Sequence, residues 1–258
     1  MGTRLRNKTA LVTGSTSNIG RAIAVTLGAE GAHVVVSGRS AERGAQVVEE
    51  IRSAGGRADF VAADLDGTSR ASRALAEEAT RALGGRIDIL VNNVGVTTGG
   101  ASTPDTTEAD LDLVYAVNVK APFFLTAEIA PAMAAAGGGA VINLGSWVAR
   151  LGIPVGSGYA ATKGALETLT RAWSAEFGPR GVRVNGISPG VVRAPEPGDT
   201  GPHPAAAMMN GTPAGTIGMP DAVAQAAVYL AGDEAAFVHG TVIDVDGGRV
   251  GVAVIAAA

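Results

Sequence analysis

The chain has 258 residues, of which 47% are hydrophobic and 17% are charged, so it can bury a large core and global disorder is excluded. Its net charge of −4 comes without a block of lysine or arginine, which argues against nucleic acid or an anionic membrane surface as a partner. The absence of cysteine excludes disulfides, thiolate catalysis and cysteine-bound metals.

The two ends of the sequence lead us to expect a cytoplasmic protein. Residues 1–8 are polar and do not resemble a signal peptide. The longest fully apolar run, residues 250–258, is far shorter than the roughly 20 residues that span a membrane. The three histidines, His33, His203 and His239, lack the spacing of metal ligands, so no metal site is expected.

Runs of β-branched and apolar residues alternate along the chain with stretches of helical periodicity. This alternation is typical of βαβ units, which build a doubly wound parallel sheet flanked by helices. We therefore predict an α/β fold of about seven strands, with residues 1–258 in one domain. Strands are expected at 9–13, 33–37, 60–62, 87–92, 140–144, 182–187 and 242–245, and helices from about 19 and at 41–54, 69–83, 108–136, 159–178 and 221–232.

Residues 191–218 interrupt this regular order and are rich in proline, glycine and methionine. A long segment without regular structure in a compact domain is usually a lid or a binding loop, or it is disordered. We interpret residues 191–218 as a lid over the substrate.

Two glycines, Gly14 and Gly20, bracket the turn between the first expected strand and the first helix. Small residues at this turn let the backbone approach a pyrophosphate, which then sits on the N-terminus of the helix. The spacing differs from the standard Gly-x-Gly-x-x-Gly, so an ordinary glycine-containing turn is the alternative. The residues assigned to the phosphate site are Gly14, Ser15, Thr16, Asn18 and Ile19.

The end of the second strand indicates which nucleotide binds. An acidic residue there binds the ribose 2′-hydroxyl of NAD, whereas an arginine accommodates the 2′-phosphate of NADP. This strand is followed by Arg39 and Ser40, so we predict NADP(H) as the preferred cofactor and NAD(H) as the alternative. The other interpretation of Arg39 is a solvated cation in a loop, without a role in binding. Asp64, next to Leu65 after the third strand, could accept a hydrogen bond from the adenine amino group, or could cap a turn.

Tyr159 and Lys163 are four residues apart in an expected helix, so both side chains lie on one helical face. A free phenol holds its proton to about pH 10, and a neighbouring ammonium lowers that pKa. The hydroxyl of Ser146 can hydrogen-bond a carbonyl or alkoxide oxygen. Together these residues suit proton transfer at such an oxygen, although a chance tyrosine and lysine on an amphipathic helix would show the same spacing.

A set of motifs follows the chain in a fixed order: Thr13-Gly14, Gly20, Asp64, Asn92-Asn93-Val94-Gly95, Asn118, Ser146, Tyr159-x-x-x-Lys163 and Pro189-Gly190. With these motifs the chain resembles the classical short-chain dehydrogenase/reductase family, and its layout resembles the 3-oxoacyl-carrier-protein reductases. The resemblance extends from about residue 8 to residue 248. It implies a Rossmann-type sheet, a nicotinamide cofactor, and a homotetramer, with a dimer as the alternative.

The resemblance also implies a role for each catalytic position. Tyr159 would be the general acid in carbonyl reduction and the base in alcohol oxidation. Lys163 would hold the nicotinamide ribose and lower the pKa of Tyr159, and Ser146 would fix the substrate oxygen. Asn118 would hold a water that relays protons from Lys163 to solvent.

For the cofactor, the resemblance implies contacts from the ends of later strands. Asn92 and Gly95 would line the adenosine and nicotinamide riboses. Pro189, Gly190 and the backbone of Val192 would hold the nicotinamide carboxamide.

Two positions depart from the family pattern. Asn18 stands where the family has its middle glycine; asparagine visits left-handed φ/ψ readily, but its side chain could either bind or crowd a phosphate. Ala194 stands where a threonine is common, so a carboxamide contact is missing or comes from Thr200 or Thr212.

The function expected from these features is interconversion of a ketone and a secondary alcohol of low molecular weight, with hydride transfer to or from NADP(H). A non-catalytic nucleotide-binding protein and a cofactor-retaining epimerase or dehydratase are the alternatives. Residues 96–98, Trp147, Val148 and 191–218 are expected to line the substrate pocket. The alanine-rich helices 108–136 and 159–178 are expected either between subunits or on the sheet.

Overall fold

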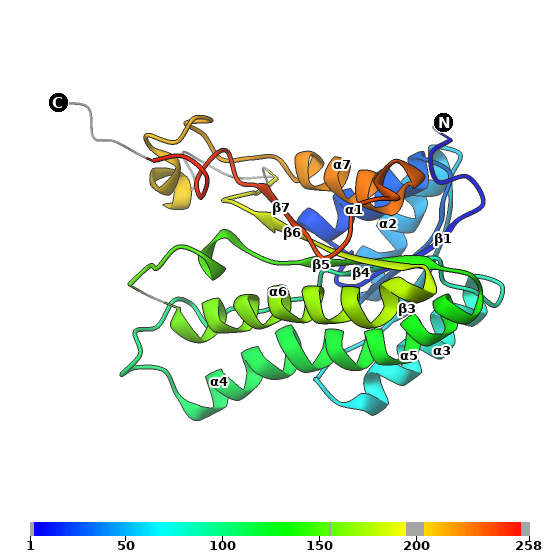
Figure 1. The fold of residues 1–258 in the computed structure, drawn as a ribbon, viewed down its shortest axis with the longest axis horizontal. Helices are drawn as coiled ribbons and strands as arrows, with labels where there is room; N and C mark the ends of the chain where they lie inside the picture. The colour runs from blue at the N-terminus through cyan, green and yellow to red at the C-terminus, as the bar shows by residue number, and fades with distance from the viewer. Residues whose placement is uncertain (1–2, 155, 195–203, 254–258) are drawn as a thin grey trace.

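The computed structural model describes residues 3–154, 156–194 and 204–253. Within them, seven parallel strands form one sheet in the order β3-β2-β1-β4-β5-β6-β7, and helices cover both faces (Figure 1). This confirms the predicted doubly wound α/β fold. The strands are β1 Thr9–Val12, β2 His33–Gly38, β3 Arg57–Ala62, β4 Ile89–Asn92, β5 Gly139–Leu144, β6 Val182–Pro189 and β7 Val242–Val245.

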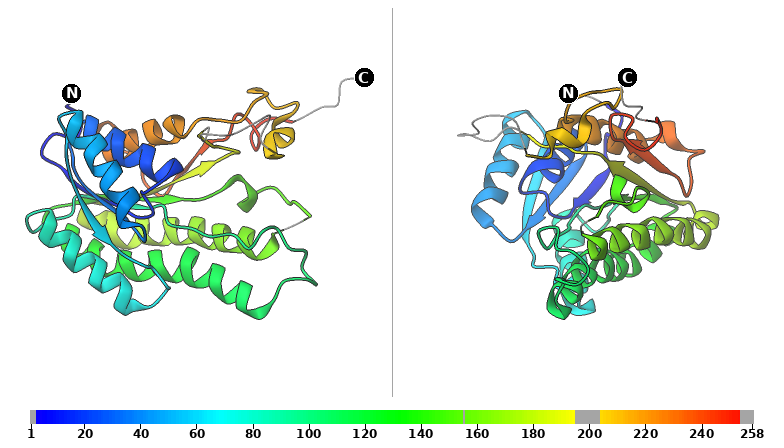
Figure 2. Two further views of the ribbon diagram at one scale, coloured as in Figure 1. Left: turned by 180° about the vertical axis from the view of Figure 1, so that it is seen from behind. Right: turned by 90° about the vertical axis from the view of Figure 1, so that its left-hand side faces the viewer.

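The helices lie in two layers, with α1, α2 and α7 on one face of the sheet and α3 to α6 on the other, as the view from behind also shows (Figure 2). Their bounds are α1 Asn18–Ala29, α2 Ala41–Ser53, α3 Ser69–Ala82, α4 Glu108–Tyr115, α5 Ala121–Ala135, α6 Ser157–Phe177 and α7 Pro220–Ala231.

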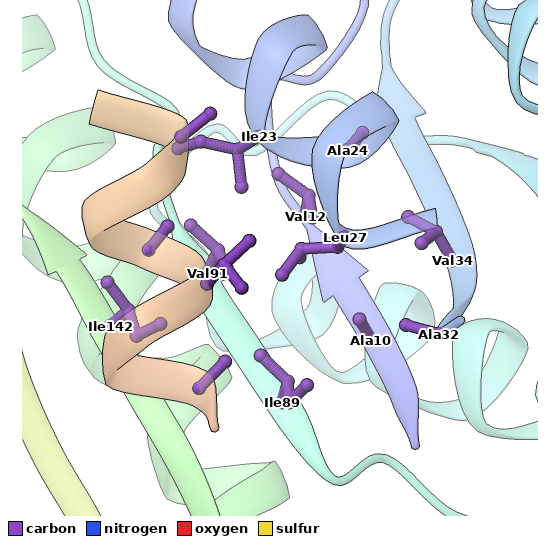
Figure 3. Packing of buried hydrophobic residues seen from close by; sticks show 14 of the residues in the cluster. Ala10, Val12, Ile23, Ala24, Leu27, Ala32, Val34, Ile89, Val91 and Ile142 are labelled. Atoms are coloured by element: carbon purple, nitrogen blue, oxygen red, sulfur yellow. The ribbon is translucent and has the colours of Figure 1, made fainter. Parts of the chain in front are cut away.

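Two apolar cores result, because successive side chains of a strand point to opposite faces of the sheet. On β1, Ala10 and Val12 belong to the core under α1 and α7, whereas Leu11 between them belongs to the core under α3, α5 and α6. Figure 3 shows the first of these cores, with Ile23 and Leu27 of α1 above the strands. The buried runs on β1, β2, β4 and β5 are therefore mainly apolar, as expected for a parallel sheet covered on both sides, with Ser37, Asn92 and Asn143 as buried polar exceptions.

Most element boundaries lie within two residues of the sequence prediction, and three differences are larger. Strand β3 begins at Arg57 rather than residue 60, because an edge strand tolerates polar side chains such as Asp59. The expected helix 108–136 is interrupted by a π-helical turn, Ala116–Lys120. Within 191–218, Pro204–Met209 forms a 3-10 helix and Val192 pairs with Gly218, so this segment has more regular structure than expected.

The stretch Glu108–Ala135 is long and apolar enough to cross a membrane by length and composition, but half of its most apolar window is buried inside the protein. Its buried members include Leu125, Ile129 and Met133, which belong to the core under α3, α5 and α6. Thr200 and His203 lie outside the described residues.

Candidate active site

An open cleft of about 680 Å³ lies at the carboxyl ends of the strands. Strand β1 has β2 on one side and β4 on the other. The strands are therefore added in one direction from β1 to β3 and in the opposite direction from β4 to β7. Ligands of open α/β sheets bind at the point where this order reverses. The cleft brings together residues predicted from both halves of the sequence: Gly14, Thr16, Asn18, Ile19, Arg39, Asp64, Leu65, Gly95, Ser146, Tyr159, Lys163, Pro189 and Gly190.

The glycine turn fits a pyrophosphate. Gly14 has φ +61°, and a Cβ on Gly20 would lie 2.3 Å from the carbonyl oxygen of Gly14, so neither position accepts a larger residue without a shift of the backbone. Helix α1 begins directly behind the turn, at Asn18, and has no acidic side chain in its first turn. Free amide groups at a helix N-terminus and a small-residue turn are what an anionic cofactor requires.

Asn93 holds this turn in place, and the sequence analysis did not select it for the site. Its Nδ2 donates to the carbonyl oxygens of Thr13 at 2.8 Å and Gly14 at 3.0 Å, and the hydroxyl of Thr13 accepts from the backbone of Asn93 and Val94. Asn93 therefore fixes the end of β1 to the segment after β4, and it lines the cleft.

Asn92, which was expected to line the cofactor, instead points into the core. Its Nδ2 donates to Thr126 of α5 and to Asn143 of β5, and the residue is buried. Alternation along β4 is the reason: Leu90 faces the α5 layer, and Asn92, two residues on, faces the same way. Alternation places Asn92 and Asn93 on opposite sides of the strand, but the packing of the sheet decides which of the two sides meets the cleft.

Three other residues assigned to the cofactor do not line the cleft. The hydroxyl of Ser15 is buried, donates to Val12 O at 2.7 Å and accepts from Ser37 N, so it joins β1 to β2. Ser40 caps α2 by accepting from Arg43 N. Val192 forms the bridge with Gly218.

One end of the cleft is lined by Arg39 and Arg43, together with Asp64. Strand β2 ends at Gly38, where a Cβ would lie 2.8 Å from Thr16 Cγ2. The chain therefore passes close to the phosphate turn just before Arg39. A planar guanidinium suits a phosphate dianion.

At the other end of the cleft, Ser146 follows β5 while Tyr159 and Lys163 lie on one face of α6. Burial raises the pKa of the Tyr159 phenol, and a hydrogen bond with Ser146 acts in the opposite direction. The Ser146 hydroxyl and the Tyr159 phenol therefore lie within hydrogen-bond reach of one another, and their joint action on one substrate oxygen stays a prediction.

Lys163 is buried, which lowers its pKa to about 8. Its Nζ donates to Leu144 O at 2.8 Å and lies 5.7 Å from the centroid of the Tyr159 ring. From the resemblance, Lys163 was expected to lower the pKa of Tyr159. In this structure the pKa of Tyr159 is raised instead, because burial is the largest effect on the phenol. The Lys163 ammonium is directed to the Leu144 carbonyl.

The side chain of Asn118 is fully engaged with its neighbours. Its Oδ1 accepts from Val96 N at 2.8 Å, while Nδ2 donates to Val96 O and to Thr162 Oγ1. Asn118 lies in the π-helical turn, an irregularity that is frequent at functional sites. It thereby fixes the segment after β4, which lines the cleft at Val96, and its predicted water relay stays a prediction.

The residues of the cleft combine a cradle for a dinucleotide with a hydroxyl, a phenol and an ammonium at the far end. Among the described residues, no group of three His, Asp or Glu side chains is placed to hold a metal ion. This combination defines an NAD(P)-dependent oxidoreductase that acts on CH–OH groups. The chain belongs to the short-chain dehydrogenase/reductase family, since the family model described as enoyl-(acyl carrier protein) reductase matches residues 14–249.

Relatives cover nearly the whole chain. The cyclopentanol dehydrogenase of Comamonas sp. (strain NCIMB 9872) is 35% identical over 247 residues, which are 95% of this chain and 98% of that protein. The 3-oxoacyl-(acyl-carrier-protein) reductase of Thermotoga maritima is 33% identical over 96% of this chain and 99% of its own length. A solved 7α-hydroxysteroid dehydrogenase, complexed with NADH and 7-oxo glycochenodeoxycholic acid, has a TM-score of 0.86 at 34% identity over 95% of each chain.

Proposed function

We propose that this enzyme interconverts a ketone and a secondary alcohol with NADP(H) as the preferred cofactor and Tyr159 as the proton donor and acceptor. The observation that carries the proposal is the continuity of the cleft. One cavity is lined by Gly14 and Asn18 at the phosphate turn and by Ser146, Tyr159 and Lys163 at the other end.

The bound nicotinamide supplies or accepts the hydride at the substrate carbon. In the direction of reduction, Tyr159 donates its phenol proton to the carbonyl oxygen, and the hydroxyl of Ser146 donates a hydrogen bond to the same oxygen. Two donors aimed at a developing oxyanion stabilise the transition state more than the ground state. In the direction of oxidation, the phenolate of Tyr159 takes the hydroxyl proton of the alcohol.

Lys163 holds the ribose of the cofactor in this proposal. With a pKa of about 8, its ammonium is mostly protonated at neutral pH and can donate to hydroxyl oxygens. Gly95 leaves room for it, since a Cβ there would lie 3.4 Å from Lys163 Nζ. Release of the Leu144 carbonyl would free the ammonium to approach the phenol oxygen and lower its pKa.

The preference for NADP(H) rests on Arg39, supported by Arg43. Both guanidinium groups line the cleft beside the end of β2, where an NAD-specific site places an acidic residue. Asp64 lies after β3 and is assigned to the adenine amino group. NAD(H) remains usable, because every contact to the rest of the dinucleotide is shared by both cofactors.

Residues 191–218 act as the lid in this proposal, and the whole chain acts as one domain in the cytoplasm. Val96, Thr97 and Leu113 line the same cleft as Tyr159 and would contact an apolar part of the substrate. The hydroxyl of Thr212 donates to Met209 O at 2.7 Å, so it does not replace the hydroxyl missing at Ala194.

The test is a panel of ketones assayed by the absorbance of NADPH and NADH, with the wild-type enzyme and Tyr159→Phe. The wild type should consume NADPH stoichiometrically with one ketone, and Tyr159→Phe should lose about 100-fold or more of kcat while thermal shifts show that it still binds NADPH. Wild-type turnover in Tyr159→Phe would refute the role of Tyr159. NADPH binding without net consumption would favour a non-catalytic or epimerase function.

A further inference from the structure

Arg249 carries a guanidinium group that the mechanism does not use. Within residues 3–154, 156–194 and 204–253, its Nε is shielded from solvent and has no hydrogen-bond partner. A buried donor that is left unpaired costs about 1–3 kcal/mol, and such groups are rare in native proteins. The position of Arg249 relative to the cleft indicates which kind of group could pair with its guanidinium.

The turn that precedes Arg249 is held rigidly. The carboxylate of Asp246 accepts from the backbone amides of Gly248 and Val250, both at 2.8 Å, and the residue is buried. Its negative charge is therefore satisfied by two amides rather than by Arg249. A rigid turn fixes the starting point of the Arg249 side chain.

This turn lies directly behind one wall of the cleft. A Cβ on Gly190, which lines the cleft, would be 2.7 Å from Asp246 Cα. The same turn contacts the proposed lid, because Ala214 N donates to Gly247 O and a Cβ on Gly248 would lie 2.7 Å from Pro213. Figure 1 shows this C-terminal segment beside residues 204–218, at the end of the sheet where α6 begins.

The side chain of Arg249 extends toward the segment after β5. Its guanidinium carbon lies 5.2 Å from the centroid of the Trp147 ring, and Trp147 directly follows Ser146, which lines the cleft. Arg249 therefore lies beside the residues that adjoin Gly190 and Ser146, at the border of the cleft and the proposed lid. That region is where a substrate with its carbonyl on Ser146 would extend.

A neighbouring arginine at this end shows the contrast. Arg150 donates to Glu167 at 3.2 Å and to Asp244 at 2.8 Å, so two carboxylates compensate its charge. Among the described residues no carboxylate lies within ion-pair distance of Arg249. Stacking on an aromatic ring satisfies the face of a guanidinium. The Nε of Arg249 is shielded from solvent, but its two terminal nitrogens are not among the buried unpaired atoms and can pair with a planar anion.

We propose that Arg249, stacked on Trp147, binds a carboxylate of the substrate, so that the enzyme acts on ketones that carry an acidic group some distance from the carbonyl. This inference rests on the proposed ketone reduction. The carboxylate pairs with the two terminal nitrogens of the guanidinium through two parallel hydrogen bonds, while the carbonyl oxygen lies on Ser146 and Tyr159. Specificity arises because an uncharged analogue leaves the guanidinium charge without a partner.

Matched pairs of substrates test the proposal directly. Wild-type enzyme is assayed with levulinate and methyl levulinate, and with a cyclohexanone carboxylate and its methyl ester, each with NADPH. In at least one pair, the acid should exceed its ester in kcat/KM by about 10- to 100-fold, the value of a charged hydrogen bond. A matching keto phosphate is included, and a preference for it over both acids would overturn the assignment to a carboxylate.

Variants then assign the preference to Arg249. Arg249→Gln should bring the ratio of kcat/KM between acid and ester to about 1, through a higher KM for the acid. Arg249→Lys should retain part of the preference for the acid. Arg81→Gln, on the distant helix α3, should retain all of it. An unchanged ratio in Arg249→Gln, or equal losses for acid and ester, would overturn the proposal and leave Arg249 with a structural role. If Arg249→Gln does not fold, the wild-type ratio and Arg249→Lys still decide.

Failure of this inference is distinguishable from failure of the proposed function. If no ketone in any pair consumes NADPH, the ketone reduction itself is refuted. If acids and esters are reduced equally well by the wild type, reduction stands and the carboxylate site is refuted.

Discussion

The side-chain oxygen of Asn18 lies 3.4 Å from the backbone nitrogen of Ala194, which donates to it. These two residues are the positions at which the sequence was expected to depart from the family pattern, and 176 positions in the sequence separate them. Asn18 adopts a left-handed conformation with φ 44°, which suits the glycine that the family has there. Its side chain thus connects the phosphate turn to the segment after Pro189-Gly190, on either side of the cleft.

Replacement of Asn18 should separate the effect of backbone conformation from that of the side chain. Asn18→Ala keeps a Cβ in the left-handed region and loses the amide, so it should lower the stability by about 1–2 kcal/mol. Asn18→Gly loses the same contact without the conformational cost and should stay within about 1 kcal/mol of the wild type. Denaturant unfolding measures both, and equal stability of the two variants would contradict the argument from φ.

Ser146→Ala should change both the rate and its dependence on pH. The hydrogen bond from Ser146 lowers the pKa of Tyr159 against the effect of burial, so its removal raises that pKa further. Alcohol oxidation needs the phenolate, and the rising limb of its pH profile should therefore move to higher pH. Loss of one donor to the oxyanion should also reduce kcat by about 100- to 1000-fold.

The control for Ser146→Ala is Ser157→Ala at the start of α6, where the hydroxyl is exposed and contacts Thr103. It should leave the pH profile unchanged. A profile for Ser146→Ala that moved to lower pH, or did not move, would contradict the assigned hydrogen bond.

Arg39→Ser should weaken NADPH binding selectively. The guanidinium would pair with the 2′-phosphate, which NADH lacks, so the KM for NADPH should rise by about 10- to 100-fold while that for NADH changes little. Arg43→Ser measures the share of the second guanidinium in the cleft, and Arg81→Ser on α3 is the control. Equal effects of Arg39→Ser on both cofactors would assign Arg39 to a contact common to both.

We propose that Phe123 lies in a subunit interface of the homotetramer, or dimer, that the resemblance implies, so Phe123→Asp should dissociate it. The Phe123 ring is 43% exposed and packs edge-on against Phe124, with 5.6 Å between the ring centroids. It borders an apolar groove of about 420 Å³ between α5 and α6, a kind of surface that often marks an interface. Light scattering should give a lower mass for Phe123→Asp and an unchanged mass for Ala74→Asp, an exposed position on α3. A wild-type monomer would refute the oligomer.

The sequence by itself determined the order of the elements and the chemistry of the site. Buried parallel strands need apolar residues at nearly every position, and helices need a period of 3.6, so β4 and α6 were predictable from local composition. Tyr159, Lys163 and Ser146 were selected because few residue types can transfer a proton to a carbonyl. The cradle of Gly14 and Gly20 followed from their place between a strand and a helix.

Only the tertiary structure shows to which side of the sheet each polar side chain points, and which residues it contacts there. Asn92 and Asn93 are adjacent, yet one lies in the core beside Thr126 and the other holds the phosphate turn, because the strand directs neighbouring side chains to opposite sides. The contacts of Asn18 with Ala194 and of Trp147 with Arg249 join segments about 100 or more residues apart. Local patterns carry no information about such pairs, since they form only where the folded strands bring their ends together.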